Sequence, residues 1–323
     1  MSNLAFLFPG QGSQSKGMLD AFADSSVVRS TLEEASDALA YDMTALIRDD
    51  ADEKLGQTEY TQPALLTAST AVLRLWREQG GREPTHVAGH SLGEYSALVA
   101  AGVVDFSDAV QLVSFRGQAM TQAVPAGVGR MAAILGLADD ILEGLCEQVS
   151  TQTEQVWAVN YNCPGQLVVA GHAAAVDRLI ETAKQAGARR ALPLAVSAPS
   201  HTPLMRPAAD AMSARLQEIE FKQPSCPVWT NVDALARQDV AEIRAALVEQ
   251  LVSPVRWTET IQGLRGADVL LAVEMGPGKV LAGLSKRIAR DIAMNNVLTP
   301  EQLTASIASV AASDASDGSD GSE

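Results

Sequence analysis

The chain has 323 residues, of which 47% are apolar, and a formal net charge of −15 at pH 7. This length and composition suffice for one large globular domain or a large domain with a smaller insert. The acidic balance argues against nucleic-acid binding, which needs a net basic surface. No stretch approaches the roughly 18 apolar residues that cross a bilayer, which argues against a membrane protein.

The cysteines favour a cytoplasmic protein. Cys146, Cys163 and Cys226 share no spacing typical of a metal or redox site. An odd number without a pairing pattern fits a reduced compartment better than secretion. The first residues also lack the basic segment and long apolar run of a signal peptide. Residues 313–323 are almost entirely Ser, Asp and Gly with acidic charges only, which predicts a disordered acidic tail.

The N-terminal segment predicts a strand, a glycine loop and a helix. Residues 4–8 are an apolar run that reads as a buried strand ending at Pro9-Gly10. A helix is predicted over 63–79, with Pro63 in its first turn and apolar residues at helical spacing. A short strand is predicted over 86–88.

Directly after this strand comes Gly89-His90-Ser91-Leu92-Gly93, a Gly-x-Ser-x-Gly turn. In this pattern the serine sits on a sharp strand-to-helix bend, with its hydroxyl exposed and a helix N-terminus behind it. An Ala-rich helix is predicted over 94–101, ended by Gly102. A tight turn with a capping serine is the alternative, but the strand before it and the helix after it favour a nucleophile.

The later elements predict two domains. A helix over 107–120, capped by Ser107, is followed by a β-α-β-β-α-β order typical of the split ferredoxin-like unit. Its predicted strands and helices cover 131–135, 139–148, 156–159, 166–170, 173–186 and 191–196. We therefore predict a small ferredoxin-like domain, 126–197, inserted into a large catalytic domain.

The large domain is predicted to comprise residues 1–125 and 198–312. It resumes with a helix over 203–218, a strand over 228–231, a helix over 240–251, a strand over 269–273 and a helix from 279. Strands that alternate with helices predict an α/β fold with a mainly parallel sheet, here α/β-hydrolase-like. Ligands bind beyond the carboxyl ends of such strands, so we expect the chemistry in the loops 10–14, 89–93 and 274–278.

A serine nucleophile needs a base, usually a histidine. The chain has four: His86, His90, His172 and His201. His201 lies in a polar, proline-braced loop that leads into a helix, and it is the predicted base. No acid occurs between residues 181 and 210, so no third triad member stands out, although Asp268 and Glu274 are distant candidates. A backbone carbonyl can orient the histidine instead.

Three further features of the sequence bear on the site. The loop 10–14 resembles a dinucleotide fingerprint, but Ser15 replaces the third glycine; the alternative is a backbone N–H beside the serine, as an oxyanion hole requires. Because this fingerprint is incomplete, no cofactor is expected. His86 and His90 lie on a strand and a bend and do not share one helix face, so no metal is expected either. Arg116, among apolar neighbours, is either a surface residue with a buried stem or a buried anion clamp.

Taken together, several motifs closely resemble the malonyl-CoA:acyl-carrier-protein transacylases of bacterial type II fatty acid synthesis. The resemblance runs from about residue 3 to 310, in the family's order. It rests on Phe8-Pro9-Gly10-Gln11-Gly12-Ser13-Gln14, Gly89-His90-Ser91-Leu92-Gly93-Glu94, Arg116, Asn160-Tyr161-Asn162, Pro199-Ser200-His201 and Gln250-Leu251-Val252-Ser253-Pro254-Val255-Arg256-Trp257.

The resemblance implies ping-pong acyl transfer from malonyl-CoA to acyl carrier protein in fatty acid biosynthesis. Ser91 is then the nucleophile and His201 the base, oriented by the backbone carbonyl of Gln250. Arg116 pairs with the malonyl carboxylate. The resemblance further implies an oxyanion hole formed by backbone N–H groups of Gln11 and Leu92. It also implies that His90, Asn160 and Asn162 support substrate binding.

Other functions remain open at this point. They are the malonyl-loading subunit of a malonate decarboxylase, a serine esterase, and a non-enzymatic relative that lost the chemistry. An acidic carrier would need a local basic face to dock on this acidic chain. The candidate clusters are Arg189-Arg190 and Lys286-Arg287-Arg290, for which ordinary solvated charge is the alternative.

Overall fold

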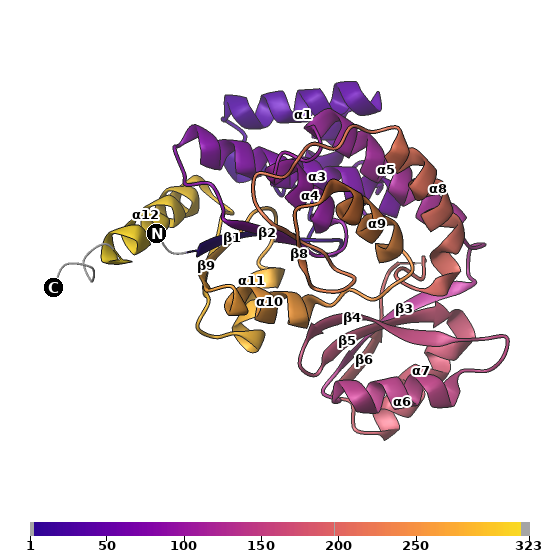
Figure 1. Cartoon of the computed structure of the whole chain (residues 1–323). Coiled ribbons are helices and arrows are strands. Elements are labelled where there is room, and N and C mark those ends of the chain that lie inside the picture. Colours follow the sequence, from indigo (N-terminus) through magenta and orange to yellow (C-terminus); the bar gives the residue numbers. More distant parts are fainter. Residues whose placement is uncertain (1–2, 197, 318–323) are drawn as a thin grey trace.

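A six-stranded sheet forms the centre of the larger part of the molecule (Figure 1). The structure is a computed structural model that describes residues 3–196 and 198–317. Neighbouring strands are parallel except for the last pair, which is antiparallel. In spatial order the strands are β10 (Ala293–Asn296), β9 (Val269–Glu274), β1 (Asn3–Phe8), β2 (His86–Gly89), β7 (Val228–Trp229) and β8 (Ala236–Arg237). The prediction of an α/β fold with a mainly parallel sheet is thus confirmed.

Helices cover both faces of this sheet because its central strand is apolar on both. On β1, Leu4, Phe6 and Phe8 join one core, and Ala5 and Leu7 join another, as the alternation of side chains along a strand requires. The first core lies under α1 (Ser26–Leu39), α2 (Met43–Arg48), α3 (Thr58–Glu78), α4 (Gly93–Ala100), α5 (Phe106–Gln122), α8 (Arg206–Gln217) and α9 (Val240–Gln250). The second lies under α10 (Trp257–Gly266) and α11 (Val280–Ile288), on the opposite side of the sheet (Figure 1).

A separate four-stranded antiparallel sheet is formed by residues 129–193. Its strand order is β4 (Val156–Cys163), β5 (Gln166–His172), β3 (Gly129–Leu135) and β6 (Arg190–Pro193). Helices α6 (Asp139–Val149) and α7 (Ala173–Gln185) pack on one face of it (Figure 1). Val255, in the segment between α9 and α10, connects the larger part of the molecule to β4. Its carbonyl accepts from Tyr161 N at 2.9 Å and its N–H donates to Val159 O at 2.8 Å.

Two predicted helix starts were wrong. Helix α3 begins at Thr58, so Pro63 lies inside it rather than in its first turn. The extra turn is held by α5, where Gly117 approaches so closely that a Cβ there would lie 2.6 Å from Glu59 Cα. Helix α5 begins at Phe106 with Asp105 as N-cap, so Ser107 is not the cap.

Other boundaries differ by a few residues. Strand β6 ends at Pro193 and β7 at Trp229, short of the predicted ends at 196 and 231. The last helix, α12 (Pro300–Asp317), runs into the predicted tail, of which residues 318–323 lie outside the described residues. No helix or strand was predicted for α1, α2, α10, α12, β8 or β10. Among the described residues no helix is long and apolar enough to cross a membrane.

Candidate active site

The Gly-x-Ser-x-Gly segment forms the predicted bend between β2 and α4. Ser91 has a φ of 51°, in the left-handed region that non-glycine residues rarely adopt. Neither flanking glycine has room for a side chain: a Cβ on Gly89 would lie 1.9 Å from the Gly93 carbonyl, and one on Gly93 would lie 2.1 Å from Phe8 O. Both glycines are therefore required by close backbone approach, and the strained residue is the candidate nucleophile.

The imidazole of His201 lies next to the serine hydroxyl. Its Nε2 lies 2.8 Å from Ser91 Oγ, and its Nδ1 lies 2.7 Å from the backbone oxygen of Gln250 at the end of α9. With the ring proton on Nδ1, His201 donates to that carbonyl, which leaves Nε2 free to accept the serine proton. Asp268 and Glu274 do not take this role. Glu274 instead accepts from the N–H groups of Leu281 and Ala282 in α11.

Arg116 is fully buried and reaches the same point. Its Nη2 lies 3.3 Å from Ser91 Oγ and donates to Gln250 Oε1 at 2.9 Å, and its Nη1 donates to Gln62 Oε1 at 2.8 Å. The guanidinium stands over the ring of Tyr95, 5.4 Å from the ring centre. Both of these oxygen partners are neutral amides, so they accept from Nη1 and Nη2 without neutralising the charge of the arginine. The Nε of Arg116 is buried and has no hydrogen-bond partner in the described part of the chain.

The electrostatics keep His201 neutral. Burial, and then the nearby charge of Arg116, lower its pKa to about 3. A neutral imidazole at neutral pH is the form that can accept a proton. Burial also lowers the pKa of His90; its Nε2 lies 2.8 Å from Asn162 Oδ1.

A cavity of about 320 Å³ opens over these groups. The proposed oxyanion residues Gln11 and Leu92 line it, as do His90 and Asn160. Asn160 Oδ1 is buried and has no hydrogen-bond partner in the described part of the chain. Asn162 reaches the site only through His90. All other predicted site residues except Gln250 line the cavity, and Gln250 lies directly behind His201.

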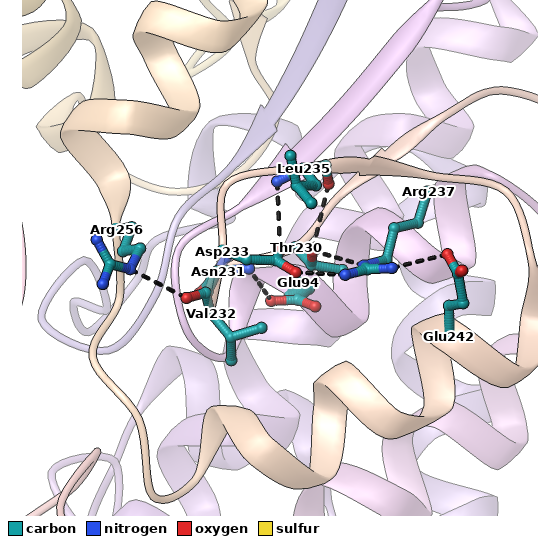
Figure 2. A network of polar contacts seen from close by, with 9 residues as sticks. All are labelled: Glu94, Thr230, Asn231, Val232, Asp233, Leu235, Arg237, Glu242 and Arg256. Atoms are coloured by element: carbon teal, nitrogen blue, oxygen red, sulfur yellow. Dashed lines mark hydrogen bonds and ion pairs between the residues drawn. The ribbon is translucent and has the colours of Figure 1, made fainter.

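Three buried polar residues near the serine were not predicted: Gln62, Glu94 and Asn231. Asn231 accepts from Ser91 N at 2.6 Å and donates to Gly89 O at 2.7 Å, so it spans the bend. Figure 2 shows the backbone N–H of Asn231 donating to Glu94. The available signal for Glu94 was its place at the end of the serine motif. Gln62 and Asn231 gave none, because each meets the site across a long sequence separation.

Within the described residues, no group of three or more His, Cys, Asp or Glu side chains is placed to hold a metal ion. The three cysteines are buried and free.

The fold and the serine site define an acyl-transferring α/β protein, and the comparison with known families agrees. The family model of acyl transferase domains matches residues 5–302, and the chain belongs to this family.

Similar proteins cover almost the whole chain. The malonyl CoA-acyl carrier protein transacylase of Salmonella typhimurium is 50% identical over 95% of this chain and 99% of its own. The structure of the acyl-carrier-protein S-malonyltransferase of Burkholderia pseudomallei is 51% identical over 94% of this chain and 99% of its own, with a TM-score of 0.92. A malonyl-transacylase in complex with a type II PKS acyl-carrier protein is 49% identical over 95% and 100%, with a TM-score of 0.93.

Proposed function

We propose that this chain transfers the malonyl group of malonyl-CoA to the phosphopantetheine thiol of an acyl carrier protein, through a malonyl ester on Ser91, in fatty acid biosynthesis. One observation carries the proposal: the hydroxyl of Ser91 lies within 3.3 Å of both a neutral imidazole and a buried guanidinium. The first suits a serine nucleophile and the second an anionic acyl group. The names of the similar proteins also give malonyl-CoA as the acyl donor and acyl carrier protein as the acceptor.

In the loading step Ser91 Oγ attacks the thioester carbonyl carbon while its proton passes to His201 Nε2. Backbone N–H groups of Gln11 and Leu92 stabilise the oxyanion, supported by their position around the cavity beside Ser91. The carbon–sulfur bond then breaks, and the CoA sulfur leaves with the proton from His201. The carrier thiol reverses these steps, so its proton passes to His201 and returns to Ser91 as the acyl group departs.

Arg116 binds the malonyl carboxylate and so selects the acyl group. A buried guanidinium forms two parallel hydrogen bonds to a carboxylate, which a lysine cannot do. Acetyl-CoA leaves that cation without its anion, which disfavours the wrong substrate. The neighbouring His90, Asn160 and Asn162 support the bound substrate.

The carrier is proposed to dock through basic residues near the small sheet. Arg189, Arg190, Lys286, Arg287 and Arg290 are all exposed. Arg287 also has a structural role, because its guanidinium donates to Gln166 Oε1 at 2.6 Å and Pro164 O at 3.0 Å. It therefore ties α11 to the β4–β5 turn.

We infer two domains from the two sheets and their topology. The small domain, 126–197, is ferredoxin-like, supported by the strand order β4-β5-β3-β6. The large domain, 1–125 and 198–312, is α/β-hydrolase-like, supported by its serine bend after a central parallel strand. Residue 197, at the boundary, lies outside the described residues. A cytoplasmic location is supported by the free cysteines.

The test is intact mass after mixing with malonyl-CoA, followed by addition of holo acyl carrier protein. Wild type should gain one malonyl group and lose it to the carrier, whereas Ser91→Ala should gain none. A malonyl adduct on the Ser91→Ala variant would overturn the proposal. Transfer of malonyl to the carrier by Ser91→Ala at the wild-type rate would also overturn it.

A further inference from the structure

Glu94 is a fully buried acid that the acyl-transfer steps above do not use. It lies in the first turn of α4, next to the serine bend. Its Oε2 accepts from Gln250 Nε2 at 2.8 Å and from the backbone N–H of Asn231 at 3.0 Å. Its Oε1 has no hydrogen-bond partner within the described part of the chain. A buried carboxylate is costly unless it is paired or hydrogen-bonded, so its place here requires an explanation.

Both partners of Glu94 hold the serine bend. Gln250 Nε2 also donates to Ser91 O at 3.1 Å. The Asn231 side chain accepts from Ser91 N at 2.6 Å and donates to Gly89 O at 2.7 Å. Glu94 thus anchors two groups that fix the backbone of a residue in a strained conformation.

The loop that presents Asn231 is itself braced from outside (Figure 2). Arg237 pairs with Asp233 and with Glu242, and Arg256 Nε donates to Val232 O at 3.1 Å. The bracing ion pairs are partly exposed, whereas Glu94 is not exposed at all. These contacts hold the loop so that the backbone N–H of Asn231 donates to the buried carboxylate of Glu94.

The same amide connects Glu94 to the substrate-binding arginine. Gln250 Oε1 accepts from Arg116 Nη2 at 2.9 Å while Gln250 Nε2 donates to Glu94. One side-chain amide therefore separates the guanidinium from the carboxylate. A negative charge on Glu94 orders this amide, because it fixes which end of Gln250 faces the arginine.

We propose that Glu94 is a positioning residue whose ionised carboxylate orients the Gln250 amide and, through it, holds Arg116 and the Ser91 bend in the reactive arrangement. This inference rests on the proposed malonyl transfer. Protonation of Glu94 removes the charge that fixes the amide, so the arrangement should loosen and loading of Ser91 should slow.

The environment places this protonation near neutral pH. Burial raises the pKa of Glu94 to about 7, opposed by the hydrogen bonds from Gln250 and Asn231 and by the charge of Arg116. The other groups that face it are Asp233, from the loop after β7, and the Tyr95 phenol on α4. Glu94 is ionised above pH 7, so loading should be fast there and should fall as pH drops through 7. His201, with a pKa of about 3, does not titrate in this range.

The experiment measures the rate of Ser91 malonylation by quenched flow and intact mass, from about pH 6 to about pH 8. Wild type should lose about tenfold in rate over this interval, since the ionised fraction of an acid of pKa 7 falls about tenfold toward pH 6. Glu94→Gln keeps an acceptor for both donors and removes the charge. At every pH it should load at or below the rate that wild type shows at pH 6, with no inflection near 7.

Glu274→Gln is the matched control, because Glu274 is also fully buried but binds the N-terminus of α11 instead of the serine bend. It should keep the wild-type rate and inflection. A Glu94→Gln variant that loads at the wild-type rate at pH 8 overturns the inference. So does a wild-type profile without an inflection near 7, a measurement that needs no variant to fold. The inference alone fails in these cases, whereas absence of any adduct on wild-type Ser91 is the failure of the proposed function.

Discussion

Replacement of Arg116 by alanine should reverse the preference of the enzyme for malonyl over acetyl groups. Arg116 is 1% exposed, and its Nη2 lies 3.3 Å from Ser91 Oγ, so it stands beside the acyl group in the proposed intermediate. Without it the malonyl carboxylate would be buried with no cation. Removal of one partner of a buried, hydrogen-bonded charge pair costs about 2–5 kcal/mol, which is a loss of about 30-fold to about 5,000-fold in rate.

The acetyl group of acetyl-CoA has no carboxylate for Arg116 to bind, so the loading of acetyl by Arg116→Ala should stay the same or rise. The assay is single-turnover acylation of Ser91 with each thioester, read by intact mass. Arg74→Ala is a suitable control, because Arg74 also stands over an aromatic ring, that of Phe106 at 4.9 Å, but lies outside the cavity. Thermal unfolding separates a folding defect from a lost contact. Equal losses with malonyl-CoA and acetyl-CoA would refute the reasoning.

Three further outcomes follow from the contacts around the serine and on the surface. Gly93→Ala should destabilise the protein by about 1–3 kcal/mol and abolish loading, because the new Cβ would lie 2.1 Å from Phe8 O; unchanged thermal unfolding would contradict this. Ser91→Gly should be more stable than Ser91→Ala by about 1 kcal/mol in denaturant unfolding, since glycine relieves the positive φ of this residue; the opposite order would show that the bend is unstrained. Charge reversal at Lys286 and Arg287 should weaken transfer to the carrier more than loading from malonyl-CoA. Equal loss in both half-reactions would exclude this docking face. Lys286→Glu alone is the control, because it leaves the contacts of Arg287 with the small sheet intact.

The local parts of the fold could be predicted because their signals are local. The strand over 86–88, the serine bend and the stop at Gly102 match β2, the turn and the end of α4 within one residue. The start of α3 could not be predicted, because its first turn is set by the close approach of Gly117. Strands β8 and β10 have two and four residues, too short for a clear alternation of apolar and polar positions.

The same division applies to the site. Residue type and local pattern indicate Ser91 and His201. For Arg116 the pattern alone allows a surface or a buried position, and only the family resemblance indicates the malonyl carboxylate as its partner. Glu94, Asn231 and Gln62 escaped because their roles lie in contacts across 54 to 156 positions of sequence. Buried polar residues give no periodic signal that distinguishes a structural hydrogen bond from a functional one.

The choice of a carbonyl to orient the histidine follows from the charge of the substrate. A carboxylate in contact with His201 would lie beside Arg116, and the two would pair, in competition with the malonyl carboxylate. The structure instead places a neutral backbone oxygen on His201 and neutral amide oxygens on the guanidinium. The positive charge therefore stays available for the substrate, while Glu94 acts from one amide away. An esterase for neutral substrates faces no such competition and can use an acid at this position.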